Sequence, residues 1–181
     1  AKQPNNPVTF NLRGVVLSAK GDQKAARAAF EKAVSIEATF TPAVMNLVKF
    51  DLRDGREEDA RKRLEALLAG RASDPQALMA LAELRNRAGA SRQQVGELLE
   101  RAQTGNPNLL QPRVALVAWY VQGGEKTKAL DLASATKEKF PYSAEALLLL
   151  GSTQVAVGPQ SQALSTFRRL AAAHPNRPVA H

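Results

Sequence analysis

The 181-residue chain contains no cysteine, only two histidines and few aromatic side chains. Without cysteine the protein cannot form disulfides or thiolate metal sites. The two histidines offer no ligand-spaced cluster for zinc, and no serine or carboxylate stands at a patterned distance from them for acid–base catalysis. We therefore expect no metal, no cofactor and no enzymatic activity, and we interpret His174 and His181 as solvated or capping side chains.

Long apolar runs are also absent. The four leucines Leu147 to Leu150 have Glu145 and Gln154 close by, whereas a membrane-spanning helix needs roughly 20 apolar residues. The opening stretch AKQPNNPVTF lacks an initiator methionine and an apolar run of signal-peptide length, and the chain stops at NRPVAH. We expect no membrane contact by this segment, and we interpret it as a fragment of a longer protein whose targeting signal, if any, lies outside it.

A period of about 34 residues organises the chain. Five glycines recur at intervals of 34, 34, 35 and 34 residues. A small residue stands five residues after four of these glycines. After the third glycine the matching Val95 comes six residues later, which accounts for the interval of 35. The glycines are Gly21, Gly55, Gly89, Gly124 and Gly158, and the small residues are Ala26, Ala60, Ala129 and Ala163. Such a period indicates stacked repeats of one supersecondary unit.

Within each repeat, the apolar spacing predicts two antiparallel helices. The predicted pairs are 8–20 with 23–36, 42–54 with 57–70, 75–88 with 92–104, 111–122 with 125–138, and 143–156 with 160–173. We expect small residues such as Gly14, Ala82 and Gly151 to let the two backbones approach, and Phe30 and Phe167 to fill the gap to the next repeat. The periodic glycines should supply positive φ at the turn within each pair, and Pro107, Pro141 and Pro175 should follow the second helices.

The residues that recur at fixed positions of each repeat resemble the tetratricopeptide repeat, with its W-x2-L-G-x2-Y, A-x3-F and P pattern. The resemblance implies an all-α, right-handed superhelical solenoid of about five helix-turn-helix repeats, forming one domain over residues 1–181. The repeats would cover approximately 7–40, 41–74, 75–109, 110–143 and 144–177. Departures from the pattern occur at Val95, at Ala133, and at Ala38 and Ala72 in place of proline.

A narrower resemblance concerns three segments, NLRGVVLSAKGDQKAARAAFEKA, MNLVKFDLRDGREEDARKRLEALL and ALMALAELRNRAGAS. They look like the large repeat lipoproteins of bacterial PEP-CTERM and exosortase systems, which lie beside exopolysaccharide biosynthesis genes. This resemblance implies an envelope protein, on the periplasmic side and with a lipid anchor on the full-length chain as one option, that takes part in exopolysaccharide production or protein sorting. A cytoplasmic location is the alternative.

The net charge of +8 raises the question of nucleic-acid binding. The excess charge is spread over the repeats, and Trp119, Tyr120 and Tyr142 stand apart from the basic clusters, so we expect no nucleic-acid partner. The densest charge, REEDARKR, sets Glu57, Glu58 and Asp59 four residues before Arg61, Lys62 and Arg63, which is typical of a solvated helix face. The stretch GGEKTK at 123–128 lacks the spacing of a phosphate-binding loop and falls on the turn of its repeat.

The first helix of each repeat should line a concave groove with adaptable methionines between polar residues, which suits an extended peptide or a partner helix. The predicted inward residues are Asn11, Val15, Ser18, Met45, Lys49, Arg53, Met79, Glu83, Asn86, Arg87, Gln111, Val114 and Ala118. Val15 and Glu83 interrupt the cation and amide set with which chaperone-cofactor repeats clamp a carboxylate.

Our leading hypothesis is a non-enzymatic protein-binding scaffold. The alternative is a substrate-presenting or regulatory region of an enzyme whose catalytic domain lies outside this chain.

Overall fold

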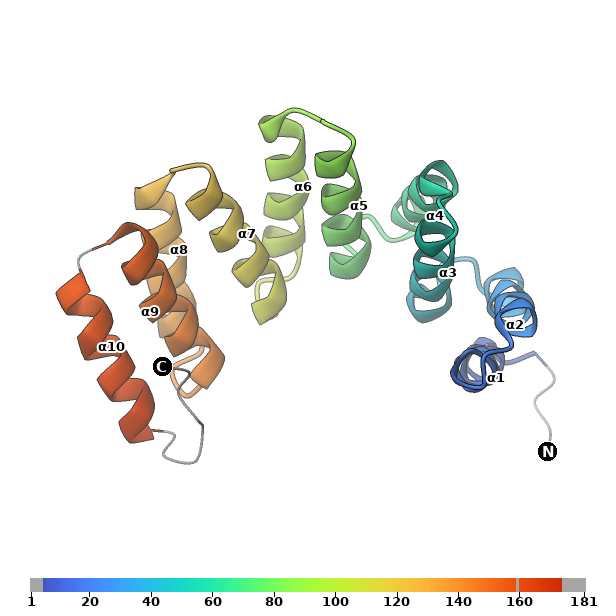
Figure 1. The fold of residues 1–181 in the computed structure, drawn as a ribbon, viewed down its shortest axis with the longest axis horizontal. Helices are drawn as coiled ribbons and strands as arrows, with labels where there is room; N and C mark the ends of the chain where they lie inside the picture. Colours follow the sequence, from blue (N-terminus) through green and yellow to red (C-terminus); the bar gives the residue numbers. More distant parts are fainter. Residues whose placement is uncertain (1–4, 159, 174–181) are drawn as a thin grey trace. The chain divides into compact units, whose positions relative to one another are not determined.

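The computed structural model describes residues 5–158 and 160–173 (Figure 1). Every regular element within these ranges is an α-helix. The helices are α1 (Pro7–Ala19), α2 (Gln23–Ile36), α3 (Thr41–Arg53), α4 (Glu57–Gly70), α5 (Pro75–Arg87), α6 (Arg92–Gly105), α7 (Leu110–Gln122), α8 (Lys126–Lys139), α9 (Ala144–Val157) and α10 (Gln160–Ala173). The all-α prediction is confirmed, and each observed boundary lies within one residue of the predicted one.

The chain forms two compact units, residues 1–105 with α1 to α6 and residues 106–181 with α7 to α10. In unit 1 each odd-numbered helix contacts the next odd-numbered helix, whereas the described parts of α2, α4 and α6 do not contact one another. In unit 2, α7 contacts α9 in the same way. Within each unit the odd-numbered helices therefore form the inner face. The single domain expected over the whole chain stays a prediction.

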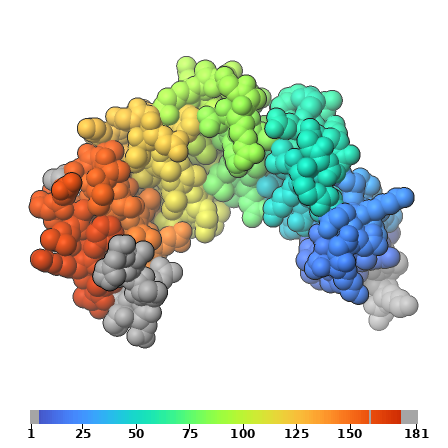
Figure 2. Space-filling view, viewed as in Figure 1, coloured from blue at the N-terminus to red at the C-terminus, as the bar shows by residue number. Residues whose placement is uncertain are grey.

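Successive pairs in unit 1 also pack on each other. The second helix of one pair contacts the first helix of the next, α2 with α3 and α4 with α5. In the space-filling view the surfaces of these pairs adjoin from blue to green (Figure 2). Each pair thus buries an apolar face that it could not cover alone.

Four of the five turns inside the pairs depend on glycine. Gly21, Gly55, Gly89 and Gly124 have φ between 70° and 86°, a region that side chains with a Cβ atom avoid. Gly158 departs from this prediction, because its φ is −116° and its backbone is extended. The reason is local: α9 continues to Val157, directly before the glycine, whereas α1 ends two residues before Gly21.

Side chains cap the starts of α2, α5 and α9, and prolines follow the ends of two other helices. Asp22, Asp74 and Ser143 accept hydrogen bonds from the backbone N–H three residues ahead, at 3.0, 3.0 and 3.2 Å. These contacts satisfy amides that have no partner inside the helix. Pro107 and Pro141 follow α6 and α8 as predicted, and Pro175 lies outside the described residues.

Small residues bring the two helices of a pair together, and phenyl rings pack directly on the glycines. A Cβ atom at Gly14 would lie 2.5 Å from Cε1 of Phe30, and one at Gly151 would lie 2.7 Å from Cε1 of Phe167. Phe30 also meets Phe50 of the next repeat edge to face, with ring centroids 5.7 Å apart. The predicted role of these rings between repeats therefore holds for Phe30, but both rings first fill space within their own pair.

The run of four leucines belongs to α9. Leu147 and Leu149 are buried, while Leu148 is 45% exposed. No helix in the described part of the chain is both long enough and apolar enough to cross a bilayer. The run is therefore one helix of a repeated pair.

Candidate functional site

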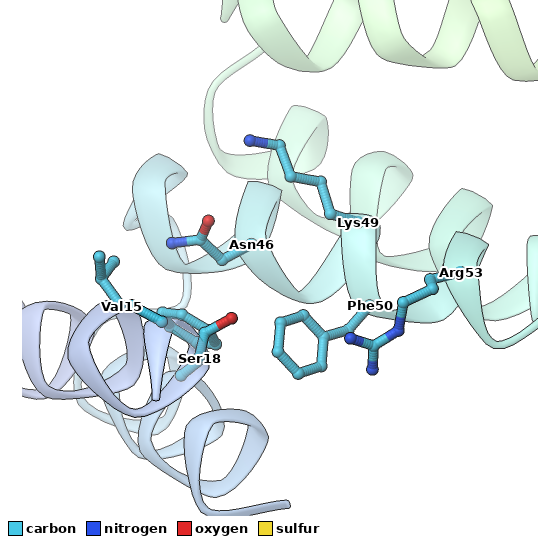
Figure 3. A pocket seen from close by; sticks show the side chains of 8 residues that line it. Val15, Ser18, Asn46, Lys49, Phe50 and Arg53 are labelled. Atoms are coloured by element: carbon cyan, nitrogen blue, oxygen red, sulfur yellow. The ribbon is translucent and has the colours of Figure 1, made fainter. Parts of the chain in front are cut away.

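An open pocket of about 410 Å³ lies on the inner face of unit 1, between α1 and α3. Phe50, only 7% exposed, forms its apolar base together with Phe30. Figure 3 shows the Phe50 ring pointing toward α1, with the Lys49 side chain extending in another direction. The complete lining is Val15, Ser18, Ala19, Phe30, Asn46, Lys49, Phe50 and Arg53.

Arg53 is held in a defined position at one edge of this pocket. Its guanidinium carbon lies 4.5 Å from the centroid of the Phe50 ring, close enough for a cation–π contact. Its Nη1 donates to Gln23 Oε1 at 2.7 Å, and its Nε donates to Asp54 Oδ1 at 3.2 Å. These contacts orient the cation in the absence of a ligand.

A buried carboxylate behind the pocket anchors the surrounding arginines. Asp51 is 1% exposed and accepts hydrogen bonds from Arg27 at 2.8 Å, Arg63 at 2.6 Å and Arg56 at 3.0 Å. Burial by itself raises the pKa of Asp51, but the hydrogen bonds from Arg27 and Arg63 outweigh it and hold the pKa below its usual value. The carboxylate therefore stays ionised and joins α2, α3 and α4.

Asp54 is the second carboxylate of this cluster. It pairs with Arg27 at 3.0 Å, Arg56 at 2.9 Å and Arg53 at 3.2 Å. Four guanidinium groups thus share the carboxylates of Asp51 and Asp54. Among the residues that the structure describes, only Arg56 pairs with a further acid, Asp59 at 3.9 Å. The cluster leaves an excess of positive charge beside the pocket.

Two asparagines connect α1 and α3 at the other side of the pocket. Nδ2 of Asn46 donates to Oδ1 of Asn11 at 3.0 Å, and Asn11 is almost completely buried. Lys49, one turn further along α3, is exposed and makes no ion pair with any described residue. The rim therefore combines an amide pair with an unpaired ammonium group.

The predicted groove residues of unit 1 fall into two groups. Lys49 and Arg53 meet at the pocket with Val15 and Ser18, and Asn11 supports it through Asn46. Met45 is half-buried on α3 and does not line the pocket. On α5, Met79 is half-buried, Asn86 is exposed, and Glu83 and Arg87 form an ion pair with each other.

The predicted residues of unit 2 lie on α7. Gln111 and Ala118 are exposed, whereas Val114 packs against the core cluster of Val117, Ala133 and Leu149. Val114 is thus a packing residue within its own unit.

Sequence reasoning missed several residues on the inner faces. In unit 1 it missed Asn46 and Phe50, although both lie within one turn of Lys49 on α3. In unit 2 it missed Leu148 and Val155 of α9, which are 45% and 55% exposed. Leu148 could have been predicted from the repeat register. It stands ten residues before the glycine of its repeat, the same position as Met45, Met79 and Val114.

Two predictions about surface residues need correction. Arg63 does not belong to a solvated helix face, because its side chain turns inward to buried Asp51. Arg61 does lie on that face, where it pairs with Glu58 and Glu65. Tyr120 is not separate from basic residues, since the ammonium of Lys128 lies 5.3 Å from its ring centroid. The GGEKTK stretch forms the turn between α7 and α8 and the first three residues of α8, so it falls on the turn of its repeat as expected.

Comparison with known proteins identifies the architecture. Family models described as tetratricopeptide repeat match residues 17–84 and 145–177, more than half of the chain. A search of curated proteins finds no match.

Solved structures with the same fold cover nearly the whole chain. The MamA protein is 19% identical with a TM-score of 0.66, over 97% of this chain and 97% of MamA. YrrB, described as a TPR protein with an unusual peptide-binding site, is 17% identical with a TM-score of 0.61, over 97% of this chain and 90% of YrrB. PilW, described as a widely conserved type IV pilus biogenesis factor, is 18% identical with a TM-score of 0.70, over 97% and 81%. With its periodic helix pairs, its glycine turns and these matches, the chain belongs to the tetratricopeptide repeat family.

Proposed function

We propose that this chain is a non-enzymatic scaffold that binds an extended peptide segment of a partner protein in the pocket between α1 and α3. The observation that carries this proposal is an open pocket with an apolar base and a polar rim on the inner face of unit 1. Peptide-binding sites combine such a base, which accepts a side chain, with a few polar groups that fix orientation. A solved tetratricopeptide relative, YrrB, carries a peptide-binding site by its own description.

The rim offers hydrogen-bonding groups that match a peptide backbone. Each asparagine amide has a carbonyl acceptor and an NH₂ donor. The bond from Asn46 to Asn11 uses one donor and one acceptor, which leaves the Asn46 carbonyl oxygen beside the pocket. An extended peptide exposes alternating N–H and C=O groups that can pair with such a side chain.

We further propose that the scaffold works in the bacterial envelope, in exopolysaccharide production or in the sorting of PEP-CTERM proteins. The support is the sequence resemblance of residues 11–33, 45–68 and 77–91 to the repeat lipoproteins of those systems. Fractionation of cells that express the full-length protein tests this location. In cells with a permeabilised outer membrane and an intact inner membrane, an envelope protein is open to added protease. Protection of the protein under these conditions, lost when the inner membrane is lysed, would place it in the cytoplasm and contradict the proposal.

A peptide selection tests the binding function. Dodecapeptides of random sequence, displayed with linkers on both sides, are selected on the folded chain, and the affinities of synthetic binders are measured by fluorescence anisotropy. Ser18→Trp fills the pocket from α1 and should weaken binding at least about tenfold. Ala28→Trp adds the same side chain at an exposed position of α2 and should leave the affinity unchanged. Equal binding by both variants would exclude the pocket as the site.

A further inference from the structure

We infer that the pocket selects peptide segments in which an acidic side chain stands beside an aliphatic one, with the acid bound between Lys49 and Arg53. This inference rests on the proposed peptide-binding function and specifies its ligand. The ligand acid is the side chain of an Asp or Glu within an extended segment.

The charge of the lining is the first argument. Lys49 and Arg53 are its two ionisable residues, and both are cationic. They stand four residues apart on α3, so they project from the same side of the helix. A carboxylate that enters beside Arg53 meets no acid of the lining. The exposed Lys49 side chain, which extends in another direction in Figure 3, donates to the same carboxylate once it turns toward Arg53.

The state of these two cations is the second argument. Lys49 has no ion pair with any described residue, so it loses no protein partner when it binds a ligand. Arg53 is already oriented by Phe50 and Gln23, and an oriented cation loses less conformational entropy on binding. Its one acid, Asp54, is shared with Arg27 and Arg56, so the charge of Arg53 is only partly neutralised.

The apolar part of the pocket is the third argument, and it favours a peptide over a polyanion. Val15 is 45% exposed at the rim and Phe50 forms the base. With Ala19 and Phe30, apolar residues make up half of the lining, and this half is suited to an aliphatic side chain. Figure 3 shows Val15 on one side of the Phe50 ring and the Arg53 guanidinium on the other. The lining thus places an apolar subsite next to a cationic one. A phosphate polymer would satisfy the cations but leave the apolar surface uncovered.

The peptide selection tests this inference through the sequences that it enriches. We expect Asp or Glu next to Leu, Ile, Val or Met. For a synthetic binder with acetylated and amidated ends, replacement of its acid by the corresponding amide should weaken binding about fivefold or more. Raising the salt concentration from about 50 mM to about 500 mM should weaken the same complex, because these charges are accessible to ions.

Variants of the chain then locate the acid. Lys49→Gln should weaken the acidic peptide about fivefold and leave its amide version unchanged. Lys49→Glu should prefer a lysine version of the peptide. Lys62→Gln, at an exposed position of α4, is the matched control and should bind like the unmodified chain. Circular dichroism confirms that each variant keeps its helices.

The outcomes separate this inference from the proposed function. Binders that are blocked by Ser18→Trp but show no preference for acids would overturn the inference and leave peptide binding intact. The inference would equally be overturned if Lys49→Gln had no effect, or if binding required a free C-terminal carboxylate. An absence of any pocket-dependent peptide would overturn the proposed function itself. Displacement of the peptide by an oligonucleotide of equal charge at lower concentration would show a nucleic-acid site instead.

Discussion

Oδ2 of Asp51 in α3 accepts a hydrogen bond from Nε of Arg63 in α4 at 2.6 Å, although the Asp51 side chain is only 1% exposed. The other oxygen of the same carboxylate accepts from Arg27 of the preceding repeat at 2.8 Å. One buried anion therefore joins the helices of the second repeat and connects them to the first. The same cluster reaches the pocket through Arg53, which pairs with Asp54 and lines the pocket. Its integrity should therefore affect both stability and binding.

Asp51→Asn should destabilise unit 1. The variant removes the anion that pairs with Arg63, and it leaves Arg27 and Arg56 with Asp54 as their remaining shared acid. We expect the free energy of unfolding to fall by about 2–4 kcal/mol. This is somewhat less than the usual cost of breaking a buried ion pair, because the arginine side chains are partly exposed to water. Urea denaturation measures it.

Glu83→Gln is the control for this change. Its ion pair with Arg87 is exposed on α5, and exposed pairs contribute little to stability. Equal effects of the two substitutions would mean that the Asp51 cluster does not hold the repeats together.

The pH dependence of stability should report on the same carboxylate. The pKa of Asp51 lies below its usual value in the folded chain, so the unfolded chain binds this proton more readily. The stabilisation is present above the unfolded pKa of about 4 and is lost as the pH falls through the folded pKa. The urea midpoint of the unmodified chain should therefore exceed that of Asp51→Asn at neutral pH, and the difference between the two midpoints should shrink as the pH falls. Parallel curves for the two proteins at all pH values would contradict this assignment.

Gly14→Ala should destabilise the first helix pair, although alanine favours a helix over glycine by up to about 1 kcal/mol. The new Cβ atom would lie 2.5 Å from the ring of Phe30, which is 1% exposed and has little room to move. We expect a net loss of about 1–2 kcal/mol from overpacking, measured by urea denaturation. Combining it with Phe30→Leu should cost less than the sum of the two single changes. Strict additivity would show that the ring and the glycine are not in contact.

Ala129→Leu should disrupt the packing of α8 against α7. Ala129 is completely buried, and we expect a loss of about 1–3 kcal/mol in denaturant titration. Ala135→Leu makes the same change at an exposed position of α8 and should be close to neutral. A neutral result at Ala129 would mean that the register of this repeat is wrong.

Part of the candidate site could be predicted from the repeat register. Lys49, Arg53, Val15 and Ser18 are inward positions of the first helices, and all four line the pocket. The register could not separate them from Met45, which occupies an inward column but does not line the pocket. The offset between neighbouring helices decides which of these side chains meet.

The sequence by itself determined the ten helices of the described residues and the turns within the pairs, because these depend on local and periodic features. Apolar spacing specifies a helical face, and a glycine after such a face permits the positive φ seen at Gly21 and Gly55. The tertiary structure alone decided that Arg63 turns inward to Asp51 and that Asn46 reaches Asn11. A long polar side chain can point to solvent or to a neighbour, and the choice depends on where the adjacent helix places its partner. That placement follows from how whole repeats pack, which the residues of one helix do not encode.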